Sequence, residues 1–202
     1  MLVSSEKSKR DRFYNFYILL LHTGLRSGEA RALKWTDIDF EQATLSVSKT
    51  LAEVGREFIV KPPKSRFSYR TIPLDREAVR VVKEQKRMQE EYKANVGEEM
   101  YKDRNIVFAS EFGQYETAQR VLVHFKRLLN AIGVTTHHTV HDLRHTFCSL
   151  LIESNIDIKT VQRLMGHANS QITLEVYASM FEGSEAKAMQ SAMKCLNEIA
   201  SF

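Results

Sequence analysis

Residues 23–29 read Thr-Gly-Leu-Arg-Ser-Gly-Glu and place Arg26 between two glycines. Apolar side chains recur at helical spacing over residues 13–21, and Gly24 is a typical helix stop. A short second helix is predicted over residues 27–33, so Arg26 lies at the junction of two helices. Glycines there let a ligand approach the backbone, and a guanidinium can bind two phosphate oxygens at once. A plain turn with a surface arginine explains the same residues.

The segment that follows this junction is predicted to form a small sheet. Apolar and polar residues alternate over 38–40 and again over 45–47, with a turn between them. Residues 58–60 and 70–72 are further strand candidates, and Pro62-Pro63 prevents one continuous strand between them. We expect a mostly antiparallel sheet of about three strands.

The chain after Asp75 is predicted to be mainly helical, which makes the expected fold class α+β with a majority of α-helix. Thr117 is a candidate N-cap, and Gly133 and Gly166 are candidate helix stops. Apolar spacing predicts helices over 78–88, 117–132, 143–151, 161–165 and 189–199, and a short helix from Ser170 that contains Tyr177.

The length of 202 residues suits one good-sized domain, and 43% hydrophobic residues are enough to form a core. We expect residues 1–10 to be a linker, residues 11–181 to form the domain, and residues 182–202 to form its tail helix. No apolar run reaches membrane-spanning length, and the polar start does not resemble a signal peptide. Cys148 and Cys195 are far apart, so we expect no disulfide and a reducing, cytoplasmic location.

The formal net charge of +4 is a mild excess, but the basic residues are concentrated in the middle of the chain. Basic side chains outnumber acids between residues 56 and 70. Residues 120–145 are rich in arginine, lysine and histidine. This distribution favours an anionic partner such as nucleic acid.

A second motif, His141-Asp142-Leu143-Arg144-His145, places His141 and Arg144 three residues apart on one predicted helix face. A cation and a hydrogen-bond donor on one edge suit an anionic group. His141 and His145 also have the spacing of zinc ligands, but the zinc-protease pattern needs glutamate where Asp142 stands, and no third ligand is evident. A buried structural role explains His145 equally well.

Two further residues stand near the end of the chain. His167 follows the helix-ending Gly166 and could project into a cleft, although a lone loop histidine is usually structural or solvated. Tyr177 comes ten positions later, and a buried tyrosine with a satisfied hydroxyl is the ordinary interpretation.

Taken together, these motifs resemble the active site of tyrosine recombinases of the phage-integrase type. TGLRxGE, HxLRH and LxGH are followed by a tyrosine over about residues 13–180, and all four in this order would rarely occur by chance. The resemblance implies the recombinase catalytic fold for residues 11–181. It assigns catalytic roles to the following residues in chain order: Arg26, His141, Arg144, His167 and Tyr177.

The resemblance also adds weaker assignments. Lys64, before Arg70-Thr71-Ile72-Pro73-Leu74, resembles the family's hairpin lysine, although Lys61 is nearby. Glu29 matches an acid that often follows the first arginine motif. Glu29 and His145 are therefore expected to support the active site.

These residues imply phosphoryl transfer to a tyrosine. Tyr177 would attack the DNA phosphate and form a covalent bond, which the resemblance implies is a 3′-phosphotyrosyl bond. Arg26 and Arg144 would bind the non-bridging oxygens, where charge develops in the transition state. His141 and His167 would donate hydrogen bonds to the phosphate.

Two proton transfers complete the implied reaction. His141 is a candidate acceptor of the tyrosine proton, and Lys64 would protonate the leaving 5′ oxygen. The covalent bond conserves the phosphodiester energy, so rejoining needs no ATP. With several fixed cations and no carboxylate cluster, we expect no metal and no other cofactor.

Double-stranded DNA is the expected partner, and the resemblance implies a homo-tetramer on DNA. An isolated domain would be weakly associated or monomeric. The tail helix would dock either on a neighbouring protomer or on its own domain. Related integrases carry a further DNA-binding domain, so the chain resembles an excised catalytic part. Candidate DNA contacts are Arg66, Arg70, Arg120, Lys126 and Arg127.

Two alternatives remain open from the sequence. A nicking and closing enzyme of the type IB topoisomerase kind shares the chemistry but relaxes supercoils as a monomer. A helical DNA-binding module that has lost catalysis is the non-enzymatic alternative, although all the expected catalytic residue types are present.

Overall fold

The computed structural model describes residues 12–168, except residues 56, 64 and 98, together with Gln171, Leu174, Val176 and Ala178. Its helices are α2 (Arg12–Thr23), α3 (Ser27–Ala32), α4 (Arg76–Val96), α5 (Ala118–Ala131), α6 (Val140–Glu153) and α7 (Ile158–Met165), with 3₁₀ turns at Trp35–Asp37 and Arg66–Ser68. The strands are β1 (Ile38–Asp39), β2 (Thr44–Val47), β3 (Thr50–Val54), β4 (Glu57–Lys61) and β5 (Arg70–Pro73). The predicted α+β class with a majority of helix is confirmed.

A three-stranded antiparallel sheet has the order β1-β2-β5, with Leu45 opposite both Ile38 and Ile72. The strand predicted at 58–60 is not part of this sheet. It belongs to β4, which pairs with β3 in a separate two-stranded hairpin, and β3 is not among the predicted strands. Alternation identifies a strand but not its partner, and Pro62-Pro63 interrupts the chain between β4 and β5.

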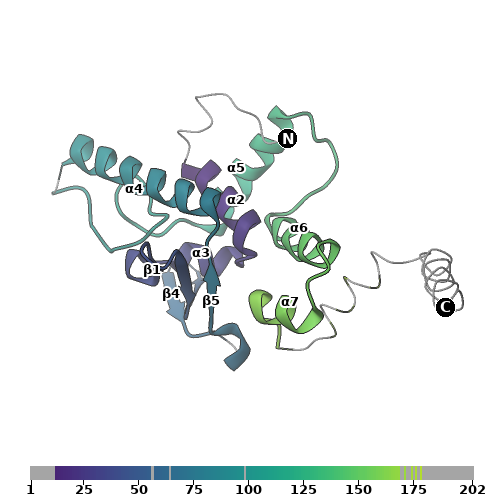
Figure 1. Cartoon of the computed structure of the whole chain (residues 1–202). Helices are drawn as coiled ribbons and strands as arrows, with labels where there is room; N and C mark the ends of the chain where they lie inside the picture. The colour runs from purple at the N-terminus through teal and green to yellow at the C-terminus, as the bar shows by residue number, and fades with distance from the viewer. Residues whose placement is uncertain are drawn as a thin grey trace, which may run out of the picture.

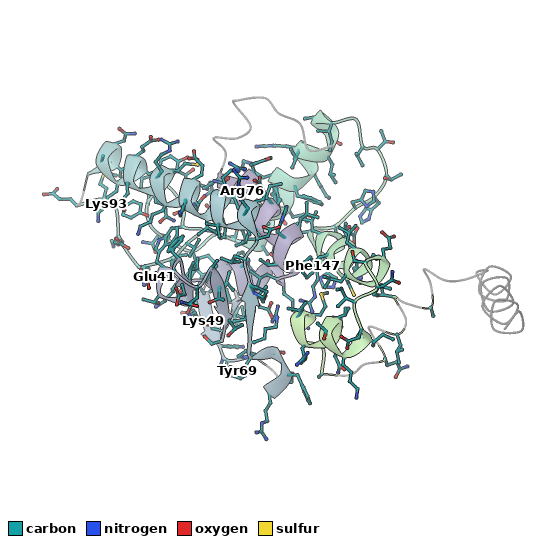
Figure 2. All side chains as sticks on the ribbon, in the orientation of Figure 1. Glu41, Lys49, Tyr69, Arg76, Lys93 and Phe147 are labelled. Atoms are coloured by element: carbon teal, nitrogen blue, oxygen red, sulfur yellow. The ribbon has the colours of Figure 1, made fainter. Side chains whose placement is uncertain are left out.

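Helix α2 lies at the centre of the domain and packs against α4 and α6 (Figure 1). It is apolar on most of its surface, as expected for a helix surrounded by others. Phe16, Leu19 and Leu20 are all nearly inaccessible to solvent. Full burial of each such side chain stabilises the fold by roughly 1.5–3 kcal/mol. Side chains from the surrounding helices and strands fill the space around α2 (Figure 2).

The pair α6 and α7 forms a second apolar cluster of Cys148, Ile152, Val161 and Met165. Asp157 is the N-cap of helix α7, and its side chain accepts a hydrogen bond from the backbone N–H of Thr160 at 3.0 Å. It ends at Gly166 in the left-handed conformation, with φ of +64°. The predicted stop at Gly166 is therefore confirmed, because glycine adopts that conformation without steric cost.

The turn at Gly24 brings the core around α2 into contact with the apolar cluster of α6 and α7. Gly24 has φ of +62°, and a Cβ placed on it would lie 2.4 Å from the Cδ1 atom of Phe147 on α6. The close approach of the α2–α3 junction to α6 therefore requires a glycine here.

Several sequence predictions fall outside the described residues, namely the linker at 1–10, the tail helix at 182–202, Lys64 and Tyr177. From the predicted Tyr177 helix, only Gln171, Leu174, Val176 and Ala178 are described, and all four are helical. Among the described residues, no helix is both long enough and apolar enough to span a membrane.

Candidate active site

Arg26 stands at the N-terminus of α3, where the chain leaves the Gly24 turn. Its side chain is 38% exposed, so the guanidinium is available to a ligand. Its Nη1 donates to Oε1 of Glu29 at 2.9 Å, and its backbone N–H donates to Oε2 of the same carboxylate at 2.9 Å. Glu29 thus fixes both the backbone and the side chain of Arg26.

Arg144 lies on α6 and is only 2% exposed. Its two terminal nitrogens donate to the carbonyl oxygens of Gly24 and Met165. One buried guanidinium therefore joins the first motif to the end of α7. Burial lowers the pKa of Arg144, and the nearby Arg26 cation lowers it further, but the group stays protonated at neutral pH.

His141 and His145 occupy successive turns of α6, and their rings meet edge to face with centroids 4.8 Å apart. Partial desolvation lowers the pKa of His141, and the neighbouring His145 and Arg144 lower it further. Asp142, between them in sequence, caps the helix instead: its Oδ2 accepts a hydrogen bond from the backbone of Thr139 at 2.9 Å. His141 is therefore a neutral, exposed imidazole beside Arg144 at pH 7.

His167 follows Gly166 and is 6% exposed. Its backbone N–H donates to the carbonyl of Gln162 at 3.2 Å, which closes the end of α7. Burial lowers the pKa of His167 to about 4, with further contributions from the cations Arg144, Arg26 and Arg70. These couplings place His167 in the same cluster as both motif arginines.

Residues from separate parts of the chain thus gather around the Gly24 turn. The cluster consists of the following side chains: Arg26, Glu29, Arg70, His141, Arg144, His145 and His167. Its three guanidinium groups are only partly balanced by the carboxylate of Glu29. A net positive cluster with imidazole donors suits a phosphate group. Among the described residues, no three His, Cys, Asp or Glu side chains are placed to bind one metal ion.

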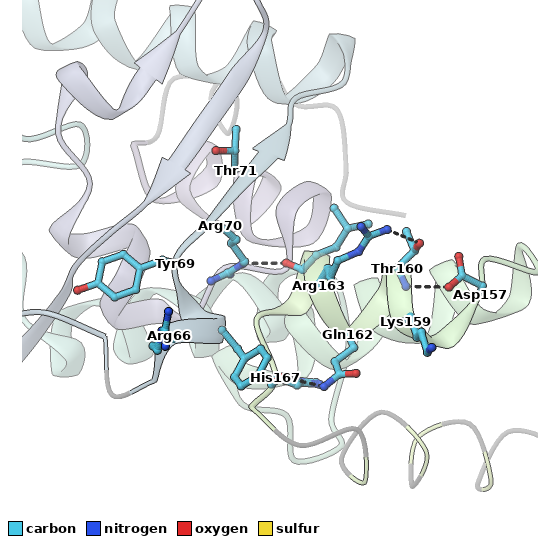
Figure 3. A pocket seen from close by; sticks show the side chains of 12 residues that line it. Arg66, Tyr69, Arg70, Thr71, Asp157, Lys159, Thr160, Gln162, Arg163 and His167 are labelled. Atoms are coloured by element: carbon cyan, nitrogen blue, oxygen red, sulfur yellow. Dashed lines mark hydrogen bonds between the residues drawn. The ribbon is translucent and has the colours of Figure 1, made fainter.

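An open cavity of about 950 Å³ adjoins this cluster between β5 and α7 (Figure 3). Arg70 and His167, which belong to the cluster, are among its lining residues. The other lining residues include basic, aromatic, neutral polar, acidic and aliphatic side chains: Arg66, Phe67, Tyr69, Thr71, Asp157, Lys159, Thr160, Gln162, Arg163 and Leu164.

The candidate DNA contacts are distributed unevenly. Arg66, Lys126 and Arg127 are exposed. Arg120 is exposed but pairs with Glu111 and Glu116. Arg70 is largely buried and bound to Glu29, so its role differs from that of a surface contact.

Lys64 and Tyr177 lie outside the described residues, but the residue before Tyr177 is informative. Val176 packs against the apolar cluster of α6 and α7, which includes Cys148 and Met165. This contact places Val176 on α6, which carries Arg144, and on α7, whose C-terminal turn leads into His167.

A sequence model described as the phage integrase family matches residues 1–183. The chain belongs to the phage integrase family.

The chain is also similar to proteins named as recombinases and transposases. The chain is 33% identical over 197 residues to a "Tyrosine recombinase XerC-like" protein of Caldanaerobacter subterraneus subsp. tengcongensis, covering 92% of this chain and 50% of that protein. It is 30% identical over 194 residues to the "Transposase from transposon Tn916" of Enterococcus faecalis, covering 92% of this chain and 45% of that protein. This integrase-family chain spans about half the length of these relatives.

A solved structure of the Tn1549 transposon integrase in complex with a circular intermediate DNA is similar to this integrase-family chain. The TM-score is 0.71 at 26% identity, over 89% of this chain and 58% of that one. The XerA recombinase has a TM-score of 0.65 at 21% identity, over 91% of this chain and 64% of that one, which shows the shared fold.

The imidazole of His167 gives this integrase-family chain a testable pH response. His167 has a folded pKa of about 4, below the ordinary value near 6.5, so the unfolded state binds more protons between these values. Stability should therefore fall as the pH drops from about 6.5 to 4, by up to about 3 kcal/mol. NMR titration of the ring signals, assigned with His167→Gln, should show His167 still neutral at pH 5. A midpoint near 6.5 would contradict the burial and the neighbouring cations.

Proposed function

We propose that this chain is the catalytic domain of a site-specific DNA recombinase that cuts and rejoins DNA through a covalent bond to Tyr177. The main support is the gathering of Arg26, His141, Arg144 and His167 around one turn, although they are far apart in sequence. The Tn1549 integrase, seen with DNA, supplies the partner by similarity. Residues 11–181 form the proposed domain, and its reaction belongs in the cytoplasm, where its DNA substrate lies.

The cationic cluster would stabilise a phosphate in the transition state. Arg26 is partly exposed and held by Glu29, so it can donate to a non-bridging oxygen without reorganisation. Arg144 already uses two nitrogens on the carbonyls of Gly24 and Met165. It would act with its remaining N–H groups and with its charge, because a guanidinium offers five donors.

The neutral histidines suit hydrogen bonding and proton transfer. With lowered pKa values, His141 and His167 hold one N–H donor and one acceptor nitrogen each at pH 7. His141 would accept the proton of Tyr177, whose ordinary pKa near 10 prevents ionisation without help. Lys64 would protonate the leaving 5′ oxygen.

Assembly on DNA completes the proposal. Four protomers would bind two DNA sites, and the segment 182–202 would dock on its own or a neighbouring protomer. No metal or ATP enters the reaction, because fixed cations replace the metal and the phosphotyrosine conserves the bond energy. Exposed Arg66, Lys126 and Arg127 would contact phosphates.

Covalent capture tests this function. The full-length protein that contains this chain is incubated in EDTA with nicked duplexes that have a randomised core, and DNA bound to denatured protein is sequenced. We expect one enriched site, with protein on the 3′ side of the cut and a free 5′ hydroxyl. Absence of any adduct would contradict the proposal. Relaxation of supercoils without strand exchange on the selected site would instead favour the topoisomerase alternative.

The proposed phosphate contacts predict how DNA affinity depends on salt concentration. Lys126→Gln should weaken binding to all DNA sequences and reduce the slope of log affinity against log salt by about one, because one released counterion is lost. Arg127→Gln should act similarly. Arg80→Gln, on the exposed face of α4 in a pair with Glu77, is the control and should leave the slope unchanged. An unchanged salt slope in both Lys126→Gln and Arg127→Gln would mean that helix α5 does not contact DNA.

A further inference from the structure

Arg70 is a basic residue of β5 whose side chain is turned into the protein. The side chain is only 5% exposed, although the strand lies next to the open cavity. In β5, Arg70 alternates onto the same face as Ile72, which is 1% exposed. Arg144 is equally buried but, within the described part of the chain, donates only to backbone carbonyls, whereas Arg70 is paired with the carboxylate of Glu29, so the charge of Arg70 is already balanced within the protein.

Arg70 and Arg26 share one carboxylate. Nη2 of Arg70 donates to Oε2 of Glu29 at 2.9 Å, and Nη1 donates to Oε1 at 3.2 Å. Arg26 donates to the same two oxygens with its backbone N–H and its Nη1. Although burial opposes ionisation, these bonds and charges hold the pKa of Glu29 below its usual range. Glu29 is a buried carboxylate with a cation on either side.

The other edge of Arg70 binds the end of α7. Its Nε donates to the carbonyl oxygen of Leu164 at 2.7 Å, as the dashed line in Figure 3 shows. A Cβ placed on Gly166 would lie 3.0 Å from Nη1 of Arg70, so the guanidinium contacts the turn that leads into His167. Arg70 therefore contacts both the carboxylate that fixes Arg26 and the backbone that presents His167.

We propose that Arg70 is a positioning residue that sets Arg26 and His167 at a fixed distance from each other through Glu29 and Leu164. The proposal rests on the proposed function, in which both residues bind the same phosphate. The three guanidiniums of the cluster then have different tasks. Arg26 and Arg144 bind the phosphate. Arg70 keeps strand β5 at a fixed distance from helix α7.

The kinetic test uses full-length protein with Arg70→Met and Arg70→Lys, and exposed Arg80→Met as the matched control. Arg70→Met should lower the rate of covalent adduct formation at saturating DNA about 100-fold, since a small misplacement of reacting groups costs that much. Its salt dependence of DNA binding should equal that of the wild type. Arg70→Lys should restore part of the rate, because an ammonium can still pair with Glu29. A slope reduced by about one would mean that Arg70 contacts a phosphate itself and would overturn the proposal.

A double variant separates positioning from simple stabilisation. If Arg70 acts through Glu29, then Glu29→Gln combined with Arg70→Met should be about as slow as the worse single variant. If the fold-losses in rate of the two single variants multiply in the double variant, Arg70 does not act through Glu29.

An NMR arm keeps this proposal distinct from the proposed function. The Nε–Hε signal of Arg26 should shift in Arg70→Met and stay in place in Arg80→Met, measured without DNA. An unmoved signal would overturn the positioning role even if the enzyme cleaves DNA. A shifted signal in a protein that forms no adduct would support the positioning geometry and count against the proposed function alone.

Discussion

Tyr177→Phe should reduce covalent adduct formation more than about a thousandfold, because loss of the nucleophile removes the only step that joins protein to DNA. Phenylalanine keeps the ring and removes only the hydroxyl, so we expect DNA affinity and the unfolding midpoint to stay at wild-type values. Adduct formation is measured on a nicked duplex that prevents religation. Tyr92→Phe, on α4 away from the cationic cluster, is the matched control and should cleave normally.

The outcome of this pair of variants is decisive about the nucleophile. Persistence of the adduct in Tyr177→Phe would assign the covalent bond to another residue. Loss of DNA affinity together with loss of the adduct would mean that the hydroxyl contributes to binding, which the proposed role does not require.

Arg144→Ala should have the second largest effect, and it should impair both catalysis and folding. Loss of one preorganised donor to the developing charge costs about 10²–10³-fold in rate. Arg144 also donates to the carbonyls of Gly24 and Met165, and its removal leaves both buried acceptors without this donor. We expect the free energy of unfolding to fall by about 3–5 kcal/mol.

Arg26→Ala separates the two effects of an arginine at this site. Its side chain is 38% exposed and pairs with Glu29, so stability should change by less than about 1 kcal/mol. Its loss of cleavage should match that of Arg144→Ala when both are assayed well below their unfolding midpoints. Equal stability losses in the two variants would contradict the different burial of the two guanidiniums.

The helices were largely predictable because their signals are local. Thr117 caps α5 by accepting a hydrogen bond from the backbone of Arg120 at 3.1 Å, as its position before an apolar stripe indicated. Gly166 ends α7 in the left-handed conformation. Both features depend on neighbours within a few residues, which the sequence displays directly.

The pairing of distant residues was less predictable. The strand candidate at 58–60 is confirmed as part of β4. Strand β3 is not among the predicted strands, because strand partners depend on chain folding rather than on local alternation. Arg70 was expected at the DNA surface because it is basic and lies in a basic segment. Its alternation with Ile72 was a signal that it points inward, but Glu29, its partner, is 41 residues away in sequence.

The gathering of the motifs around Gly24 could be expected only through the family resemblance. Nothing in the spacing of Arg26, Arg144 and His167 predicts that one guanidinium bonds both to the first motif and to the end of α7. The structure supplies that connection through the two carbonyls that Arg144 binds.

Peptide mapping of the trapped complex tests the central claim most directly. The adduct from the full-length protein is digested with a protease and a nuclease, and mass spectrometry locates the residual nucleotide. We predict a 3′-linked nucleotide on Tyr177. A nucleotide on any other side chain, or a linkage through the 5′ phosphate, would contradict the account.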